Sequence, residues 1–176
     1  QEESARLLYR EWFVRLRFPG HEHAKIRDGI PEGWKKAPLA ELAEVNRASL
    51  GKNYQGEIEY IDIAAVSPGH IEQTTTYEFS AAPSRARRVV QHGDIIWSCV
   101  RPNRRSHAVI WRPRENLIAS TGFAVITPTV VPTSFLYQAV TTDQFVGLLV
   151  ANARGVAYPA VTAPVFESAP ILTQSE

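Results

Sequence analysis

The chain has 176 residues, of which 44% are hydrophobic and 21% are charged. These proportions are typical of one globular domain and exclude wholesale disorder. Cys99 is the one cysteine, so an intramolecular disulfide scaffold is excluded. No apolar run reaches the roughly 18 residues that span a membrane, and no signal peptide is visible, so we expect a soluble, cytoplasmic protein. The chain begins with Gln1 and contains no methionine, which favours a piece of a longer protein.

The formal net charge of +1 conceals a local concentration of arginine. Residues 84–114 contain eight of the fifteen arginines and one acid, Asp94, whereas residues 115–176 contain four acids and one base, Arg154. The planar guanidinium suits phosphate oxygens and guanine edges, and here it is interleaved with strand-forming residues. We therefore expect a sheet that presents basic loops to a polyanion within the first two thirds of the chain. The alternative is a solvated strand face.

Residues 2–17 are predicted to form a helix, with acids in its first turn and arginines toward its end, as the helix dipole favours. Its apolar side chains form a wide stripe that needs a partner. The stripe can pack on the same domain or belong to a helical connector, and its aromatic content favours a docking surface. The residues assigned to partner binding are Tyr9, Trp12, Phe13 and Leu16, and the stripe also includes Ala5 and Leu8.

The sequence divides into three segments. We assign residues 1–20 to the end of a connector helix, residues 21–37 to a polar linker and residues 38–176 to the main domain. His21 and His23 have no cysteine or acid at ligand spacing in a structured element, which favours a solvated linker over a zinc site. Pro38 is expected to open a short helix that ends at residue 45.

The main domain is predicted to be rich in strands. Strands are expected over 57–66, 71–79, 89–100 with a turn at 92–94, 108–111 and 117–127. A helical region is expected over 134–154, with a second helix starting at a capping box over Thr141–Gln144, and an edge segment over 156–161. This order predicts an α+β fold on a twisted, mixed or antiparallel sheet with a few helices.

Four stretches, taken in order, resemble a target recognition domain of the specificity subunit of type I restriction-modification enzymes. The most specific element is the GDII run at 93–96, followed by Arg101 and Pro102 and then by the STGF run at 120–123. The resemblance covers roughly residues 30–172. The four stretches are IPEGWKKAPLAELAEV (30–45), YIDIAAVSPGHI (60–71), SRARRVVQHGDIIWSCVRPNRR (84–105) with STGFAVITP (120–128), and ARGVAYPAV (153–161).

The resemblance implies a module that reads DNA sequence without chemistry of its own. In that family each recognition domain binds one half of a split double-stranded DNA target, and helices set the spacing and hold the methyltransferase subunits. S-adenosylmethionine would be bound by those subunits, and ATP and Mg²⁺ would belong to the restriction subunit that translocates and cuts. We therefore expect no cofactor and no metal on this chain. The opening helix resembles the end of the connector, which implies the second of the two recognition domains.

The motifs of the sequence agree with the expectation that the chain is not an enzyme. The sequence contains no G-x-x-x-x-G-K-[ST] loop, no glycine-rich cofactor fingerprint and no hydrolase-like constellation. Cys99 follows an apolar run, which favours a small core residue over a catalytic thiolate.

Candidates for DNA contact follow from side-chain chemistry. Arginines before a predicted strand suit phosphates, and arginine, asparagine and serine in the loop between two strands suit base edges. The phosphate candidates are Arg85, Arg87 and Arg88, the base-reading candidates are Arg101, Asn103, Arg104, Arg105 and Ser106, and further candidates are Lys52 and Tyr54. Solubility and ion pairing remain an alternative for the first group, and ordinary turn formation for the second.

Other prominent residues favour architecture. In residues 120–122 a glycine allows close backbone approach and hydroxyls satisfy buried amides. Gly155, Tyr158 and Pro159 favour a structural role, although the loop beside them is able to approach the DNA backbone. The three tryptophans expected in the core are Trp34, Trp97 and Trp111. The rival interpretation of the whole chain is a protein-interaction module that docks a helical partner through the aromatic side of residues 2–17.

Overall fold

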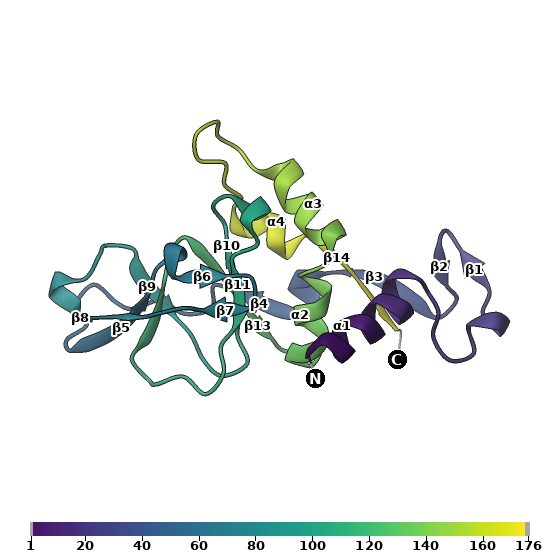
Figure 1. Cartoon of the computed structure of the whole chain (residues 1–176), viewed down its shortest axis with the longest axis horizontal. Helices are drawn as coiled ribbons and strands as arrows, with labels where there is room; N and C mark the ends of the chain where they lie inside the picture. The colour runs from purple at the N-terminus through teal and green to yellow at the C-terminus, as the bar shows by residue number, and fades with distance from the viewer. Residues whose placement is uncertain (1, 175–176) are drawn as a thin grey trace.

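The computed structural model describes residues 2–174 (Figure 1). Its few helices and mostly antiparallel strands confirm the predicted α+β class. The described strands are divided among two four-stranded sheets and three two-stranded ones. The α-helices are α1 (Glu2–Tyr9), α2 (Thr133–Ala139), α3 (Asp143–Asn152) and α4 (Ala163–Glu167).

The two four-stranded sheets form the centre of the domain. The first sheet is antiparallel and contains, in order, β11 (His107–Val109), β10 (Ile95–Ser98), β13 (Phe123–Pro128) and β4 (Ala43–Val45). The second sheet contains β8 (Thr75–Glu78), β5 (Glu57–Ile61), β12 (Leu117–Ser120) and β9 (Ala86–Val89), and its β5–β12 pair is parallel. Labelled strands of the second sheet occupy the left of Figure 1.

The alternation of side chains explains why the central strands are apolar throughout. In β10, Ile95 and Trp97 pack against α2, α3 and α4, whereas Ile96 packs toward the second sheet. In β13, Ala124 and Ile126 also pack on the side of the helices, whereas Phe123 packs toward the second sheet. Successive side chains of a strand point to opposite faces, so a sheet covered on both sides needs a continuous apolar run.

A further apolar cluster covers the outer face of the second sheet. Ile58, Tyr60 and Ile118 are buried there against Phe79 of the short helix η5 (Phe79–Ala81). The layers are therefore helices, first sheet, second sheet and a covering of short segments. This arrangement leaves the loops at the ends of the strands exposed.

Three smaller pairings complete the fold. Strand β3 (Trp34–Pro38), which covers the end of the expected linker and Pro38, pairs with β14 (Pro170–Gln174). A hairpin of β1 (Ile26–Arg27) and β2 (Ile30–Pro31) turns at Asp28 and Gly29, both with positive φ, as a two-residue Asp-Gly turn requires. The third pair is β6 (Val66–Ser67) with β7 (His70–Ile71).

Two predicted helices differ from the structure. The first helix ends at Tyr9 and continues as a π-helical turn, η1 (Arg10–Val14), and Leu8 of the predicted stripe is 52% exposed. The predicted helix over 38–45 is wrong: a 3-10 turn, η3 (Leu39–Glu41), leads into β4. Tertiary context overrides helix propensity here because Leu39 is buried and β4 pairs with β13.

The boundaries of other elements also differ from those predicted. The expected strand over 57–66 ends at Ile61, and a 3-10 turn, η4 (Ile63–Ala65), follows it. The expected strand over 117–127 is two strands, β12 and β13, in different sheets. Helix α3 is capped by Thr142 instead of Thr141, because the Thr142 hydroxyl accepts the Phe145 N–H at 3.1 Å. The remaining described 3-10 turns are η2 (His21–His23) and η6 (Pro102–Arg104).

Candidate nucleic-acid interface

The GDII run fixes the strand that carries the arginine loop. Asp94 is buried, and its carboxylate accepts the Gln91 N–H at 2.9 Å and the Thr127 hydroxyl at 2.8 Å. Burial is the main influence and raises the pKa of Asp94. Gly93 has φ 88°, which favours glycine at the turn. The two residues therefore close the turn between β9 and β10 and set the direction of β10.

Beyond β10 the chain forms a strained basic loop around η6. Arg101 and Arg105 flank this turn with φ of 48° and 55°, in the left-handed region that larger side chains rarely adopt. The Arg101 N–H donates to the Pro159 carbonyl at 2.7 Å, which holds the loop against a distant segment. Such strain persists only where surrounding contacts impose it, and it is frequent at functional sites.

The side chains of this loop fall into two groups. Arg105 donates to Asp143 at 2.6 Å, and Arg101 donates to the Ala157 carbonyl at 3.2 Å. In contrast, Asn103 and Arg104 are exposed, and their side chains make no hydrogen bond or ion pair with another described residue. Two arginines thus anchor the loop and two polar side chains point outward from it. Ser106 is half-buried, and its carbonyl accepts the Ser98 N–H.

A second segment, 153–161, lies against the basic loop. Arg154 and Ala160 form a β-bridge with two 2.9 Å hydrogen bonds, and the Val161 N–H donates to the Cys99 carbonyl at 2.9 Å. The Arg101 guanidinium lies 4.8 Å from the centre of the Tyr158 ring. We call residues 99–106 together with 153–161 the tip surface. It contains four arginines and no acid, and the segment after α3 projects at the top of Figure 1.

The phosphate candidates lie on another surface. Arg87 and Arg88 belong to β9 itself, so their expected place in a loop before the strand is wrong. The Arg87 guanidinium lies 4.5 Å from the centre of the Phe79 ring, and Arg88 pairs with Ser49 in a β-bridge. Arg85 does precede the strand, and it lies 4.0 Å from Asp62.

The structure brings the Lys52 loop to the same edge of the second sheet. The Leu50 N–H donates to the Arg87 carbonyl at 2.8 Å, so residues 47–54 follow β9. Tyr54 is half-buried with its ring 5.3 Å from that of Phe79, whereas Lys52 is exposed. We call residues 47–54 and 84–89 the β9 edge.

The STGF turn joins the tip surface to the β9 edge. The Thr121 N–H donates to the Arg85 carbonyl, and the Gly122 carbonyl accepts the Cys99 N–H, both at 2.8 Å. The buried Ser120 hydroxyl accepts the Gly122 N–H at 3.1 Å. A Cβ at Gly122 would lie 2.2 Å from Cδ1 of Ile63. The expected hydroxyl role of Ser120 and the close approach at Gly122 are therefore confirmed.

Predictions for the tryptophans and the cysteine have mixed outcomes. Trp34 and Trp97 are buried as expected, but Trp111 is 68% exposed and packs edge-on against His92. The prediction for Trp111 is wrong because the chain turns away from the first sheet after Ile110. Burial raises the pKa of the Cys99 thiol to about 11, so the thiolate is disfavoured and the core interpretation is supported.

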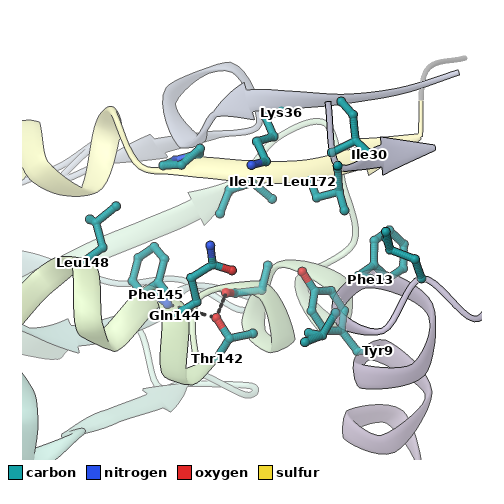
Figure 2. Close-up of a pocket in the computed structure, with 15 residues that line it drawn as sticks. Tyr9, Phe13, Ile30, Lys36, Thr142, Gln144, Phe145, Leu148, Ile171 and Leu172 are labelled. Atoms are coloured by element: carbon teal, nitrogen blue, oxygen red, sulfur yellow. Dashed lines mark hydrogen bonds between the residues drawn. The ribbon is translucent and has the colours of Figure 1, made fainter. Parts of the chain in front are cut away.

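The aromatic side chains of the N-terminal segment contact their own domain. The Phe13 ring lies 4.9 Å from Trp34 and 5.1 Å from Phe135 of α2, and Tyr9 stacks on Phe13. Burial raises the pKa of Tyr9. Figure 2 shows Tyr9 and Phe13 on one wall of a cavity of about 310 Å³, with Phe145 across from them.

Other residues of this segment remain accessible. Trp12 is half-buried, and Leu16, with φ 56°, also lines the cavity. Leu7, Leu8 and Val14 are each about half exposed. Partner binding by Tyr9, Trp12, Phe13 and Leu16 stays a prediction, although two of these side chains already pack internally.

Residues 2–174 contain neither a cluster of metal ligands nor a membrane-spanning helix. No group of three His, Cys, Asp or Glu side chains in this range is placed to hold a metal ion, and His21 and His23 are exposed. None of the helices described is long and apolar enough to cross a membrane.

The structure is an α+β domain with exposed basic loops, and comparison with known proteins shows which class it resembles. Over 73% of its length the chain is 23% identical to the HindI specificity subunit of a type I restriction enzyme of Haemophilus influenzae, of which it covers 29%. The HsdS subunit of Thermoanaerobacter tengcongensis superposes with a TM-score of 0.71 and 29% identity, over 83% of this chain and 39% of that one. No protein-family model matches the chain.

Two further structures agree in fold. A chain from a type I restriction-modification system, studied for complex assembly and conformational transition, gives a TM-score of 0.71 and 30% identity over 81% of this chain and 38% of that one. The S subunit of M. genitalium gives a TM-score of 0.50 at 13% identity over 85% of this chain and 36% of that one, which is a likeness of fold alone.

The chain thus resembles type I specificity subunits in sequence and fold, as its motifs predict. It spans between 29% and 39% of the length of these relatives. The relatives are named for specificity, which agrees with the prediction that the chain is not an enzyme.

Proposed function

We propose that the chain is a non-catalytic domain that recognises a double-stranded DNA sequence, reading one half of a bipartite target within a longer specificity subunit. The observation that carries this proposal is the tip surface, which has four arginines, no acid and a fixed backbone on a domain with the fold of specificity subunits. Clustered guanidinium groups on a rigid support suit a polyanion with hydrogen-bonding base edges.

Individual roles follow from the contacts. Asn103 and Arg104 are the base readers, because their side chains are free to pair with adenine and guanine edges. Arg101 and Arg105 act mainly as positioning residues, because both already donate within the chain. Phosphate contacts are assigned to the β9 edge, where the side chains involved are Arg85, Arg87, Arg88, Lys52 and Tyr54.

Partner subunits supply the chemistry in this proposal. The domain directs adenine methylation and cleavage by methyltransferase and restriction subunits, which bind S-adenosylmethionine, ATP and Mg²⁺. The division of the chain into a connector end (1–20), a linker (21–37) and a recognition domain (38–176) belongs to the same proposal.

Selection from a random-sequence DNA library tests this function. The full-length subunit that contains this chain, with its methyltransferase partner, is mixed with the library at moderate salt, and bound DNA is sequenced. We expect enrichment of a motif, one half of which becomes degenerate when Asn103 and Arg104 are both replaced by alanine. Equal recovery of all sequences would contradict the proposal.

A second candidate function is protein docking through the N-terminal segment. Leu7, Leu8 and Val14 are large apolar side chains that remain about half exposed on α1 and η1. A helical partner would bury them. Replacing Leu7 and Leu8 by serine should weaken association with the methyltransferase subunit and leave the selected DNA motif unchanged.

A further inference from the structure

Segment 154–160 has the features of a rigid contact finger. The Arg154–Ala160 bridge closes its base, and Gly155, with φ 103°, allows a return of the chain that no larger residue fits. A Cβ at Gly155 would lie 2.8 Å from the Tyr158 carbonyl oxygen. The bridge and the hydrogen bond from the Arg101 N–H to the Pro159 carbonyl hold the segment against the basic loop.

The finger exposes two large side chains with apolar surface. Val156 is 104% exposed and Tyr158 is 70% exposed, whereas its neighbour Val161 is buried in the core. Isolated exposed apolar residues need no explanation, but two on a rigid projection between arginines are a feature of a contact site.

The charge around the finger favours an anionic partner. Arg154 at its base is exposed and its side chain has no partner among the described residues, and Arg104 is exposed on the loop beside it. Asp143, an acid that contacts the basic loop, is already paired with Arg105. An apolar tip between cations matches a nucleic-acid groove, where phosphates flank the apolar edges of bases and sugars.

We propose that residues 154–160 form a finger that enters a groove of double-stranded DNA, where Val156 contacts base or sugar edges and Arg154 contacts a phosphate. Tyr158 is a positioning residue that holds the Arg101 guanidinium through its ring. This inference rests on the proposed function and adds a second contact element, from the last third of the chain, to the basic loop.

The test measures DNA affinity of the full-length subunit in complex with its methyltransferase partner. Val156→Ser should weaken binding to the selected DNA about tenfold, since a buried apolar contact is lost. The matched control is Val130→Ser, because Val130 is 66% exposed in a loop before α2. The control should bind like the unaltered protein.

Two further variants separate the roles within the finger. Arg154→Ala should weaken selected and random DNA alike and reduce the slope of log affinity against log salt by about one. Tyr158→Ala should relax base preference, whereas Tyr158→Phe, which keeps the ring over Arg101, should restore it.

The outcomes distinguish this inference from the function on which it rests. Unchanged DNA affinity for both Val156→Ser and Arg154→Ala would overturn the finger, even where replacement of Asn103 and Arg104 makes one half of the motif degenerate. Reduced binding of the methyltransferase subunit by Val156→Ser, with unchanged DNA affinity, would also overturn it and assign the finger to a protein contact. If the unaltered protein showed no preference among DNA sequences, the proposed function itself would be rejected.

Discussion

At the scale of single residues, the arginines of the basic loop differ in their contacts although their side chains are identical. Arg101 and Arg105 adopt left-handed backbone conformations and use their guanidinium groups within the chain. Arg104, between them, is exposed. Side-chain chemistry predicts that the loop binds DNA, but it cannot separate anchors from readers, because that distinction depends on contacts with residues 143 and 157–159.

Replacement of Arg104 tests this separation. Arg104→Ala should relax preference at one base position at a cost of roughly 1–3 kcal/mol in binding free energy. Arg114→Ala is the control, because Arg114 is exposed on another loop and pairs with Glu59 at 2.8 Å. Competition binding with single-base variants of the selected motif measures the base preference of both variants. A uniform loss at every position would show that Arg104 contacts a phosphate.

His107 should make stability depend on pH. It is buried beside Trp97, and its Nδ1 is hydrogen-bonded to the Tyr137 hydroxyl at 2.9 Å. Burial, with a smaller effect of Arg105, lowers the pKa of His107 from 6.5 to about 4. Between these values the unfolded chain binds a proton that the folded chain excludes, so stability falls as pH falls.

The expected loss is about 3 kcal/mol of unfolding free energy between pH 6.5 and pH 4. Denaturant unfolding across this range measures it, and His107→Gln should flatten the profile. Asp94, whose pKa is raised, acts in the opposite sense, but its contribution cancels between the two proteins. Parallel profiles for both proteins would show that His107 is protonated in the folded state.

At the scale of elements, the central strands are predictable and the peripheral ones are not. Strands β10 and β13 are continuous apolar runs, because each packs against helices on one face and a sheet on the other. The β3–β14 pair was missed, since no local pattern links Ala37 to Ile171. The helix predicted over 38–45 failed for the same reason: its residues pair with a strand far along the chain.

The candidate site shows the same limit. The arginine cluster indicates the basic loop, but the sequence predicts only an edge segment over 156–161 and a structural role for Tyr158. Their exposure depends on the turn at Gly155 and the bridge from Arg154 to Ala160, neither of which composition reveals. A glycine between an arginine and a valine was the one available signal.

Strand β14 provides an element-scale prediction. Ile171 is buried in the cluster beneath α2 and α3, whereas the adjacent Leu172 is half-buried at the cavity of Figure 2. Ile171→Ala should lower the free energy of unfolding by about 2–5 kcal/mol, and Leu172→Ala by less. Equal losses in denaturant unfolding would mean that the pairing with β3, and not side-chain burial, makes the larger contribution.

Helix α3 provides a second element-scale prediction, because Asp143 at its start pairs with Arg105. The Thr142 hydroxyl caps the helix, so Thr142→Ala should cost about 1 kcal/mol of stability. The exposed Arg105–Asp143 pair should add under about 1 kcal/mol. Asp143→Ala should therefore leave thermal unfolding nearly unchanged while altering DNA preference. A large fall in the melting temperature would assign Asp143 a structural role.

At the scale of the whole molecule, the two sheets share a buried cluster, and the candidate DNA-contacting residues come from distant parts of the chain. The turn at 120–122 connects the β9 edge to the basic loop, and the loop in turn holds segment 153–161. A duplex that contacts both the tip surface and the β9 edge would use phosphates for affinity and base edges for selectivity. The domain needs no chemistry of its own for this role.

The most direct test of the central claim is the sequence methylated by the complete complex across a random DNA library. The subunit containing this chain is compared with a chimera in which residues 38–174 are replaced by the matching domain of a relative. We predict that one half of the methylated motif changes and the other half stays the same. An unchanged motif would contradict DNA reading by this chain and leave protein docking through the N-terminal segment as its function.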